Sequence, residues 1–124
     1  MEFPTITRTI TPEKMVRYSG VRGIHGNDAA ARQIGLAGAI VQGGQLAGYL
    51  NEMLVTAFGR GYLEGGELSL SFVKSAKAGD VVTCHGESIG KRSVDGRTRI
   101  DCNVWLENQL GEKVTVGTAS AYLE

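Results

Sequence analysis

The sequence predicts an α+β fold in which a curved, mainly antiparallel sheet wraps around one long central helix. Three observations support this prediction. Residues 46–58 carry apolar side chains at helical spacing and on more than one side, which indicates a helix surrounded by other elements. After Gly66 the apolar pattern changes to a period of two, which is typical of strands. Asp95-Gly96 is a strong two-residue turn signal that joins two of these strands as a hairpin.

A chain of 124 residues is expected to form a single domain over residues 1–124, because a second core would leave too few residues for each. Thirteen Lys and Arg balance thirteen Asp and Glu, which argues against binding to nucleic acid or to an anionic membrane surface. No apolar run reaches the roughly 20 residues of a membrane span, and the first residues lack the layout of a signal peptide. We therefore expect a soluble, cytoplasmic protein.

The first third of the chain predicts short elements. Residues 5–10 have the character of a strand, and Thr11-Pro12-Glu13 favours the start of a short helix that ends near residue 20. A second short helix is expected over residues 27–34, and Gly35 closes it.

The central helix should end at Gly59-Arg60-Gly61. Four strands are expected after it, over residues 68–73, 81–89, 100–107 and 113–123. Such a sheet leaves edges or a face to cover, so we expect a homodimer or a larger homo-oligomer.

The two cysteines are too few for a disulfide framework or a zinc site made of cysteines alone, and we expect no metal and no cofactor. If Asp95-Gly96 is the centre of the hairpin, Cys84 faces Glu107 and Cys102 faces Ile89. The two thiols should therefore be free, which fits a reducing compartment.

The glycine-rich part of the chain contains the best candidates for chemistry. His25 lies in a loop between the two short helices, and Val41-Gln42-Gly43-Gly44 leads into the central helix. An imidazole can transfer protons near neutral pH, and the free N–H groups of a helix N-terminus can stabilise an oxyanion. Taken alone, a loop histidine is more often structural, and a glycine pair more often serves packing.

Several motifs together resemble the MaoC-like dehydratases, which are the R-specific enoyl-CoA hydratases of the hot-dog superfamily. The motifs are Ile24-His25, Ala31, Gly35, Ile40-Val41-x-Gly43 and Gly117-Thr118-Ala119. Ala31 and Gly43 follow His25 by six and eighteen residues, which matches the spacing of the family. The resemblance implies a hot-dog fold with an active site at a dimer interface. It also implies that His25 is the acid or base and that the N–H of Gly43 holds the thioester carbonyl.

The sequence departs from the family pattern around this motif. The family aspartate five residues before the histidine is replaced by Gly20, and the histidine before the oxyanion glycine is replaced by Gln42. The loop is also shorter than usual. Asp28 is the nearest carboxylate in sequence, although a cap of the short helix explains it better. Gln42, Tyr18 and Arg22 are polar candidates for binding the substrate.

These observations favour a hydro-lyase that acts on an enoyl or 3-hydroxyacyl thioester carried by coenzyme A or acyl carrier protein. The missing aspartate leaves two alternatives open. One is a different enzyme on the same scaffold, such as a thioesterase, isomerase or cyclase. The other is a non-catalytic partner subunit. Four basic residues in turns could meet the phosphates of coenzyme A, namely Lys74, Lys77, Lys91 and Arg92.

Overall fold

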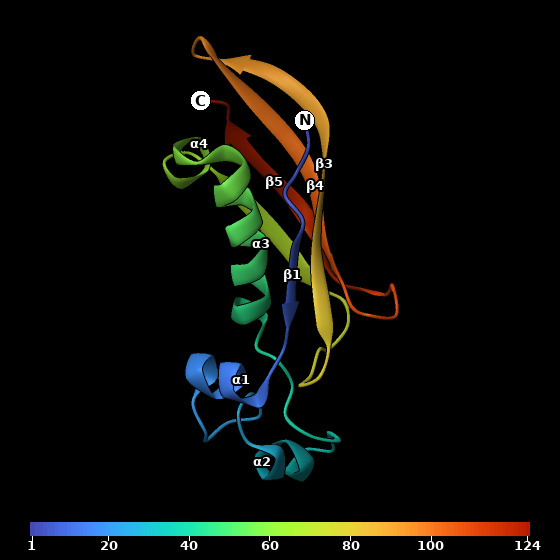
Figure 1. Cartoon of the computed structure of the whole chain (residues 1–124). Coiled ribbons are helices and arrows are strands. Elements are labelled where there is room, and N and C mark those ends of the chain that lie inside the picture. The colour runs from blue at the N-terminus through green and yellow to red at the C-terminus, as the bar shows by residue number, and fades with distance from the viewer.

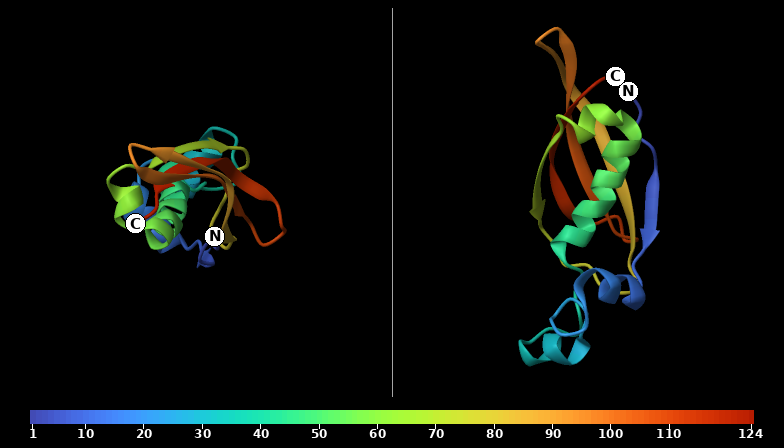
Figure 2. Two further views of the ribbon diagram at one scale, coloured as in Figure 1. Left: turned by 90° about the horizontal axis from the view of Figure 1, so that it is seen from above. Right: turned by 90° about the vertical axis from the view of Figure 1, so that its left-hand side faces the viewer.

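The computed structural model describes residues 1–124, and its five strands form one antiparallel sheet in the order β1-β3-β4-β5-β2. The sheet curves around the helix α3 (Figures 1 and 2), which confirms the predicted α+β architecture. The strands are β1 (Ile6–Thr9), β2 (Glu67–Phe72), β3 (Val81–Val94), β4 (Arg97–Glu107) and β5 (Lys113–Tyr122). The helices are α1 (Pro12–Ser19), α2 (Asp28–Gln33), α3 (Gly43–Phe58) and α4 (Arg60–Leu63).

The core lies between α3 and the concave face of the sheet. Leu50, Met53 and Leu54 on α3 are fully buried, as are Cys102 and Leu106 on β4. They belong to one cluster of 19 buried apolar residues. Burial of this apolar surface holds α3 in place and therefore sets the position of its N-terminus.

The short helices begin as the sequence predicts, with one correction. Thr11 caps α1 by accepting a hydrogen bond from the N–H of Lys14 at 3.2 Å. Asn27 caps α2 in the same way. Asp28 was expected to cap the short helix, and this expectation is wrong. Its Oδ1 instead accepts a hydrogen bond from the N–H of Ala39 at 2.8 Å. The carboxylate thus joins α2 to the segment that leads into α3.

The end of α3 agrees with the prediction, and a short helix that was not predicted follows it. The helix stops at Phe58, but the chain turns at Gly59 and continues as the single turn of α4. The backbone N–H of Arg60 donates to the carboxylate of Glu124 near the C-terminus. This contact between residues 64 positions apart could not be deduced from the local pattern.

The hairpin of β3 and β4 turns at Asp95-Gly96, as predicted, and both residues have positive φ angles. The register expected for the cysteines is wrong by one residue, because a bulge between Ser88 and Gly90 shifts the pairing. Cys84 therefore faces Leu106, and Cys102 faces Ser88. Both thiols are buried and free, as expected.

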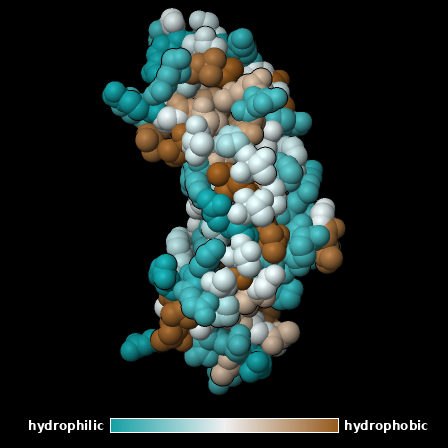
Figure 3. Space-filling view, in the orientation of Figure 1, coloured by the Kyte–Doolittle hydropathy of each residue, from teal (hydrophilic) through white to brown (hydrophobic).

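Helices α1 and α2 lie beyond the end of the sheet (Figures 1 and 2). Helix α1 lies near the N-terminus of α3, and α2 lies farther out. On the face shown in Figure 3, apolar residues form separate patches among hydrophilic ones. None of the helices combines the length and the apolar character that a membrane crossing requires.

Candidate active site

The N-terminus of α3 presents free backbone donors. Gln42 precedes the helix in an extended conformation and makes no side-chain cap. The N–H groups of Gly43 and Gly44 have no acceptor within the chain. Such groups carry the partial positive charge of a helix N-terminus and can stabilise a negatively charged oxygen.

His25 is held beside this helix end by a ladder of contacts between three segments. Its Nδ1 lies 2.9 Å from the carbonyl oxygen of Ile40. The N–H of Ile40 in turn donates to the carbonyl of Ile24 at 3.0 Å, and the N–H of Val41 donates to that of Ala76 at 2.8 Å. The loop around residue 25 is therefore attached directly to the segment that enters α3.

The contact with Ile40 determines which nitrogen of His25 can do chemistry. A carbonyl oxygen only accepts hydrogen bonds, so Nδ1 must carry a proton and donate it. In the neutral imidazole, Nε2 then keeps its lone pair and can accept a proton. The half-buried ring thus has one nitrogen engaged by the protein and one that is free to act as a base.

His25 and Gly43 border one open cleft of about 360 Å³. The segment of five residues from Phe72 to Ala76 forms another wall of the cleft. The lining is mostly apolar, and the residues are His25, Ile40, Val41, Gly43, Leu46, Phe72, Val73, Lys74, Ser75 and Ala76. A group bound here would meet an imidazole, a helix N-terminus and an apolar wall at the same time.

Close packing explains the glycines at the start of α3. A Cβ atom on Gly43 would lie 2.9 Å from the ring of Phe72, and a side chain on Gly44 would collide with the hydroxyl of Tyr18. Glycine at both positions therefore lets two aromatic side chains approach the helix end from different elements.

The three other predicted residues lie outside the cleft lining. The side chain of Gln42 accepts a hydrogen bond from the hydroxyl of Ser19 at 2.7 Å, which ties the start of α3 to the end of α1. Tyr18 lies against Gly44 and borders a separate pocket. Arg22 is exposed in the loop before His25.

No carboxylate lines the cleft. Asp28 is engaged by the N–H of Ala39, and Glu52 on α3 forms an ion pair with Arg8 of β1. Within the chain, the only hydrogen bond of His25 is therefore the one to the backbone of Ile40.

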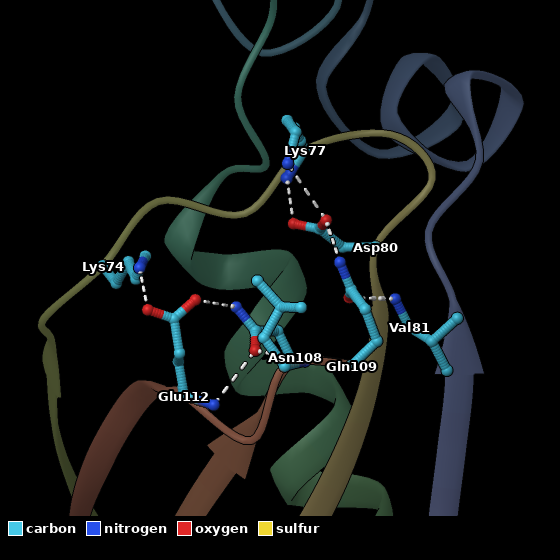
Figure 4. A network of polar contacts seen from close by, with 8 residues as sticks. Lys74, Lys77, Asp80, Val81, Asn108, Gln109 and Glu112 are labelled. Atoms are coloured by element: carbon cyan, nitrogen blue, oxygen red, sulfur yellow. Dashed lines mark hydrogen bonds and ion pairs between the residues drawn. The ribbon is translucent and has the colours of Figure 1, made fainter.

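A polar network anchors the wall of the cleft (Figure 4). The carboxylate of Asp80 accepts hydrogen bonds from the N–H of Lys77 at 3.0 Å and from the amide of Gln109 at 3.1 Å. Lys74 pairs with Glu112, which belongs to the same turn between β4 and β5 as Gln109. Burial raises the pKa of Asp80, but the hydrogen bonds from Lys77 and Gln109 outweigh it, so the pKa is lowered overall.

The sequence patterns did not identify the wall from Phe72 to Ala76 as part of the site. Phe72 and Val73 belong to the predicted strand over residues 68–73, and the residues after them read as an ordinary turn. Their position beside Gly43 depends on the pairing of β2 with β5 and on the contact between Val41 and Ala76. Only the exposed apolar pair Phe72-Val73, at the end of an alternating strand, could have drawn attention to this segment.

Comparison with protein families gives one match, to the model described as MaoC like domain, over residues 2–108. Among curated proteins no relative matches the chain.

Solved structures show the same fold at low sequence identity. The R-hydratase PhaJ1 from Pseudomonas aeruginosa is 22% identical, with a TM-score of 0.79 over 99% of this chain and 81% of that one. The (R)-hydratase from A. caviae is 20% identical, with a TM-score of 0.80 over 99% and 95%. A chain of the ChsH1-ChsH2 complex from Mycobacterium tuberculosis is 19% identical, with a TM-score of 0.79 over 98% and 94%.

Proposed function

Because the chain belongs to the MaoC-like dehydratase family, we propose that it is a hydro-lyase that acts on an enoyl or 3-hydroxyacyl thioester. One observation carries the proposal: His25 and Gly43, whose N–H has no acceptor within the chain, line the same mostly apolar cleft. Two proteins of the same fold are named as R-hydratases, which supports this reaction class.

In the hydration direction, Nε2 of His25 takes a proton from water while the water oxygen bonds to the β-carbon. The electron pair of the double bond moves toward the thioester carbonyl, which becomes an enolate oxygen. The N–H of Gly43 stabilises this charge, which is greater in the enolate than in the substrate. The proton on His25 then passes to the α-carbon, so the imidazole ends in its initial state. Dehydration is the reverse of these steps.

In this proposal His25 works without the aspartate of the family pattern, whose position is occupied by Gly20. The contact with Ile40 takes over one task of such a carboxylate, because it fixes the ring and its tautomer. It supplies no negative charge to stabilise the imidazolium, so we expect slower turnover than with a paired carboxylate.

The test is turnover of crotonyl-CoA, followed by loss of its enoyl absorbance. His25→Ala should abolish the loss, whereas His85→Ala should retain it. His85 is a suitable control because it lies in β3, stacked against Trp105, and does not line the cleft. Full activity in His25→Ala, or no turnover of enoyl thioesters of several chain lengths, would refute the proposal.

The lack of a carboxylate in the cleft favours thioester hydrolysis as a second candidate. Attack of water on the carbonyl needs one base and one oxyanion site, and His25 and Gly43 could supply both. Free coenzyme A released from crotonyl-CoA or 3-hydroxybutyryl-CoA, without hydration or dehydration, would select this reaction. An isomerase or cyclase would instead change the acyl group and keep the thioester.

We also propose a homodimer as the working unit, because β1 and β2 are edge strands with unpaired sides. A non-catalytic partner subunit is the alternative, and the two-chain ChsH1-ChsH2 complex is a reason to test it. Light scattering on the purified chain decides between them: a dimer that turns over crotonyl-CoA by itself excludes the subunit role.

A further inference from the structure

We propose that Ser19 is a positioning residue for the reaction, because it keeps the N-terminus of α3 uncapped. Its hydroxyl donates a hydrogen bond to Oε1 of Gln42 at 2.7 Å. This bond holds the side chain of Gln42 at the end of α1 and leaves the N–H groups of Gly43 and Gly44 free for an oxyanion. The role presupposes the proposed function, since only a reaction that forms an oxyanion uses these N–H groups.

The start of α3 differs from the three other helix starts of this chain. Thr11 and Asn27 cap α1 and α2 through their side-chain oxygens, which accept hydrogen bonds from backbone N–H groups at 3.2 and 3.0 Å. The first N–H of α4 donates to the carboxylate of Glu124 at 2.8 Å. Only α3, the longest helix, begins without a side-chain partner. Because a missing cap lowers stability, the open end has a reason other than folding.

The charge of the helix ends follows the same division. Glu13 lies in the first turn of α1 and Asp28 in that of α2, whereas the first turn of α3 contains no acidic residue. A carboxylate in the first turn compensates the partial positive charge of a helix N-terminus. The charge at the start of α3 is therefore uncompensated, and this is the one helix N-terminus that lines the cleft with His25.

Gln42 has the backbone conformation of a cap residue. Its φ and ψ of −68° and 140° are extended, like those of Thr11 and Asn27. The residue is half-buried and directly precedes two free donors, so its side-chain oxygen would pair with them unless another donor held it. The hydroxyl of Ser19 is that donor. Gln42 itself does not line the cleft, so its effect on the substrate passes through the helix end.

The end of α1 places this hydroxyl. Ser19 is the last residue of the helix, and Gly20 follows it with a φ of 79°, which favours glycine. The N–H of Gly20 donates to the carbonyl of Val16 at 2.7 Å and closes the helix. Helix α1 lies near the N-terminus of α3 (Figure 1). The position of the family aspartate is thus a glycine turn that sets a hydroxyl donor beside Gln42.

Variants of Ser19 in the full chain test this role with two readouts. One is kcat and KM for crotonyl-CoA, and the other is hydrogen exchange of the Gly43 and Gly44 amides, measured by NMR without substrate. In Ser19→Ala the released Gln42 should fold back onto the helix end, which slows exchange at Gly44 and lowers kcat, each about three- to fivefold. KM should change by less than about twofold, because the N–H groups hold the enolate more strongly than the substrate. Ser19→Thr keeps the hydroxyl and should restore kcat.

A matched pair at residue 42 separates the open helix end from a merely structural contact. Gln42→Ser and Gln42→Ala both lose the bond to Ser19, but only serine can cap α3. Gln42→Ser should therefore melt about 3 °C higher than Gln42→Ala and yet turn over crotonyl-CoA about tenfold more slowly. A structural role would not make the more stable variant the slower one.

Ser19→Ala with wild-type kcat and wild-type exchange at Gly44 overturns the inference, as does Gln42→Ser that turns over crotonyl-CoA as fast as Gln42→Ala. If wild type turns over no enoyl thioester, only the proposed reaction is contradicted. Hydrogen exchange then decides alone: slower exchange at Gly44 in Ser19→Ala supports the role of Ser19 in holding Gln42, and unchanged exchange overturns it.

Discussion

The Nδ1 atom of His25 lies 2.9 Å from the carbonyl oxygen of Ile40, fifteen residues further along the chain. This contact links the loop before α2 to the segment that enters α3. It therefore holds the imidazole and the helix N-terminus in a fixed relative position. The same contact sets the tautomer of the ring, because a carbonyl can only accept the hydrogen bond.

Asp28 should help to hold the imidazole of His25 beside the N-terminus of α3, without contacting the substrate itself. Its carboxylate holds the N–H of Ala39, the residue next to Ile40. Asp28→Ala should lower kcat for crotonyl-CoA about tenfold and reduce the free energy of unfolding by about 1 kcal/mol.

Asp28→Asn is the matched control, because its amide oxygen can accept the same hydrogen bond from Ala39. It should restore most of kcat. If Asp28→Ala keeps full kcat while losing stability, the residue has only a structural role.

Asp80 should contribute pH-dependent stability. Its pKa is lower in the folded chain than its ordinary value of 3.8. The stabilisation is therefore complete above that value and is lost as the pH falls through the folded pKa. Asp80→Asn should lose about 2 kcal/mol at pH 7.

Urea unfolding of wild type and Asp80→Asn at a series of pH values measures this effect. The difference in free energy of unfolding should shrink as the pH decreases below about 4, where wild type also becomes protonated. A difference that stays constant down to pH 2 would show that the charge of Asp80 is irrelevant.

The two thiols should be inert in the folded protein. Burial, with a smaller contribution from Glu52, raises the pKa of Cys84 to about 12, and burial with Asp101 raises that of Cys102 to about 11. Since the thiolate is the reactive form, less than about one thiol in a thousand is reactive at pH 8. An aromatic disulfide reagent should label both cysteines only after denaturant is added. Rapid labelling of the native chain would contradict their burial.

Thr115 offers a stabilising substitution. Its hydroxyl is fully buried and has no hydrogen-bond partner. Thr115→Val keeps the shape and removes the unsatisfied group, so it should raise the free energy of unfolding by about 1 kcal/mol. Thr118→Val, at an exposed position of the same strand, should stay within about 0.5 kcal/mol of wild type. If Thr115→Val is less stable than wild type, the Thr115 hydroxyl makes a hydrogen bond in the folded protein in solution.

Much of the fold follows from local patterns in the sequence. The apolar spacing of residues 46–58 predicts the surrounded helix, and Asp95-Gly96 predicts the hairpin turn. Thr11 with Pro12 predicts the start of α1. These features depend on neighbouring residues and on the periods of helix and strand, which can be read without knowledge of distant contacts.

The register of the hairpin could not be predicted fully, because one extra residue at the bulge, Ile89, shifts the pairing of all residues between it and the open end of the hairpin. Asp28 likewise holds Ala39 rather than capping α2, since a partner eleven residues away competes with the local one. The motif residues His25 and Gly43 were identified through a family resemblance, and their meeting at one cleft is a tertiary feature.

By itself the sequence determined the elements and the residues able to move a proton or hold an oxyanion, since residue chemistry and periodicity are local properties. The tertiary structure alone decided which side chains share a cavity. The wall from Phe72 to Ala76 owes its place beside Gly43 to long-range pairing and packing. The free energy of that packing is summed over many distant contacts, so no short stretch of sequence reveals it.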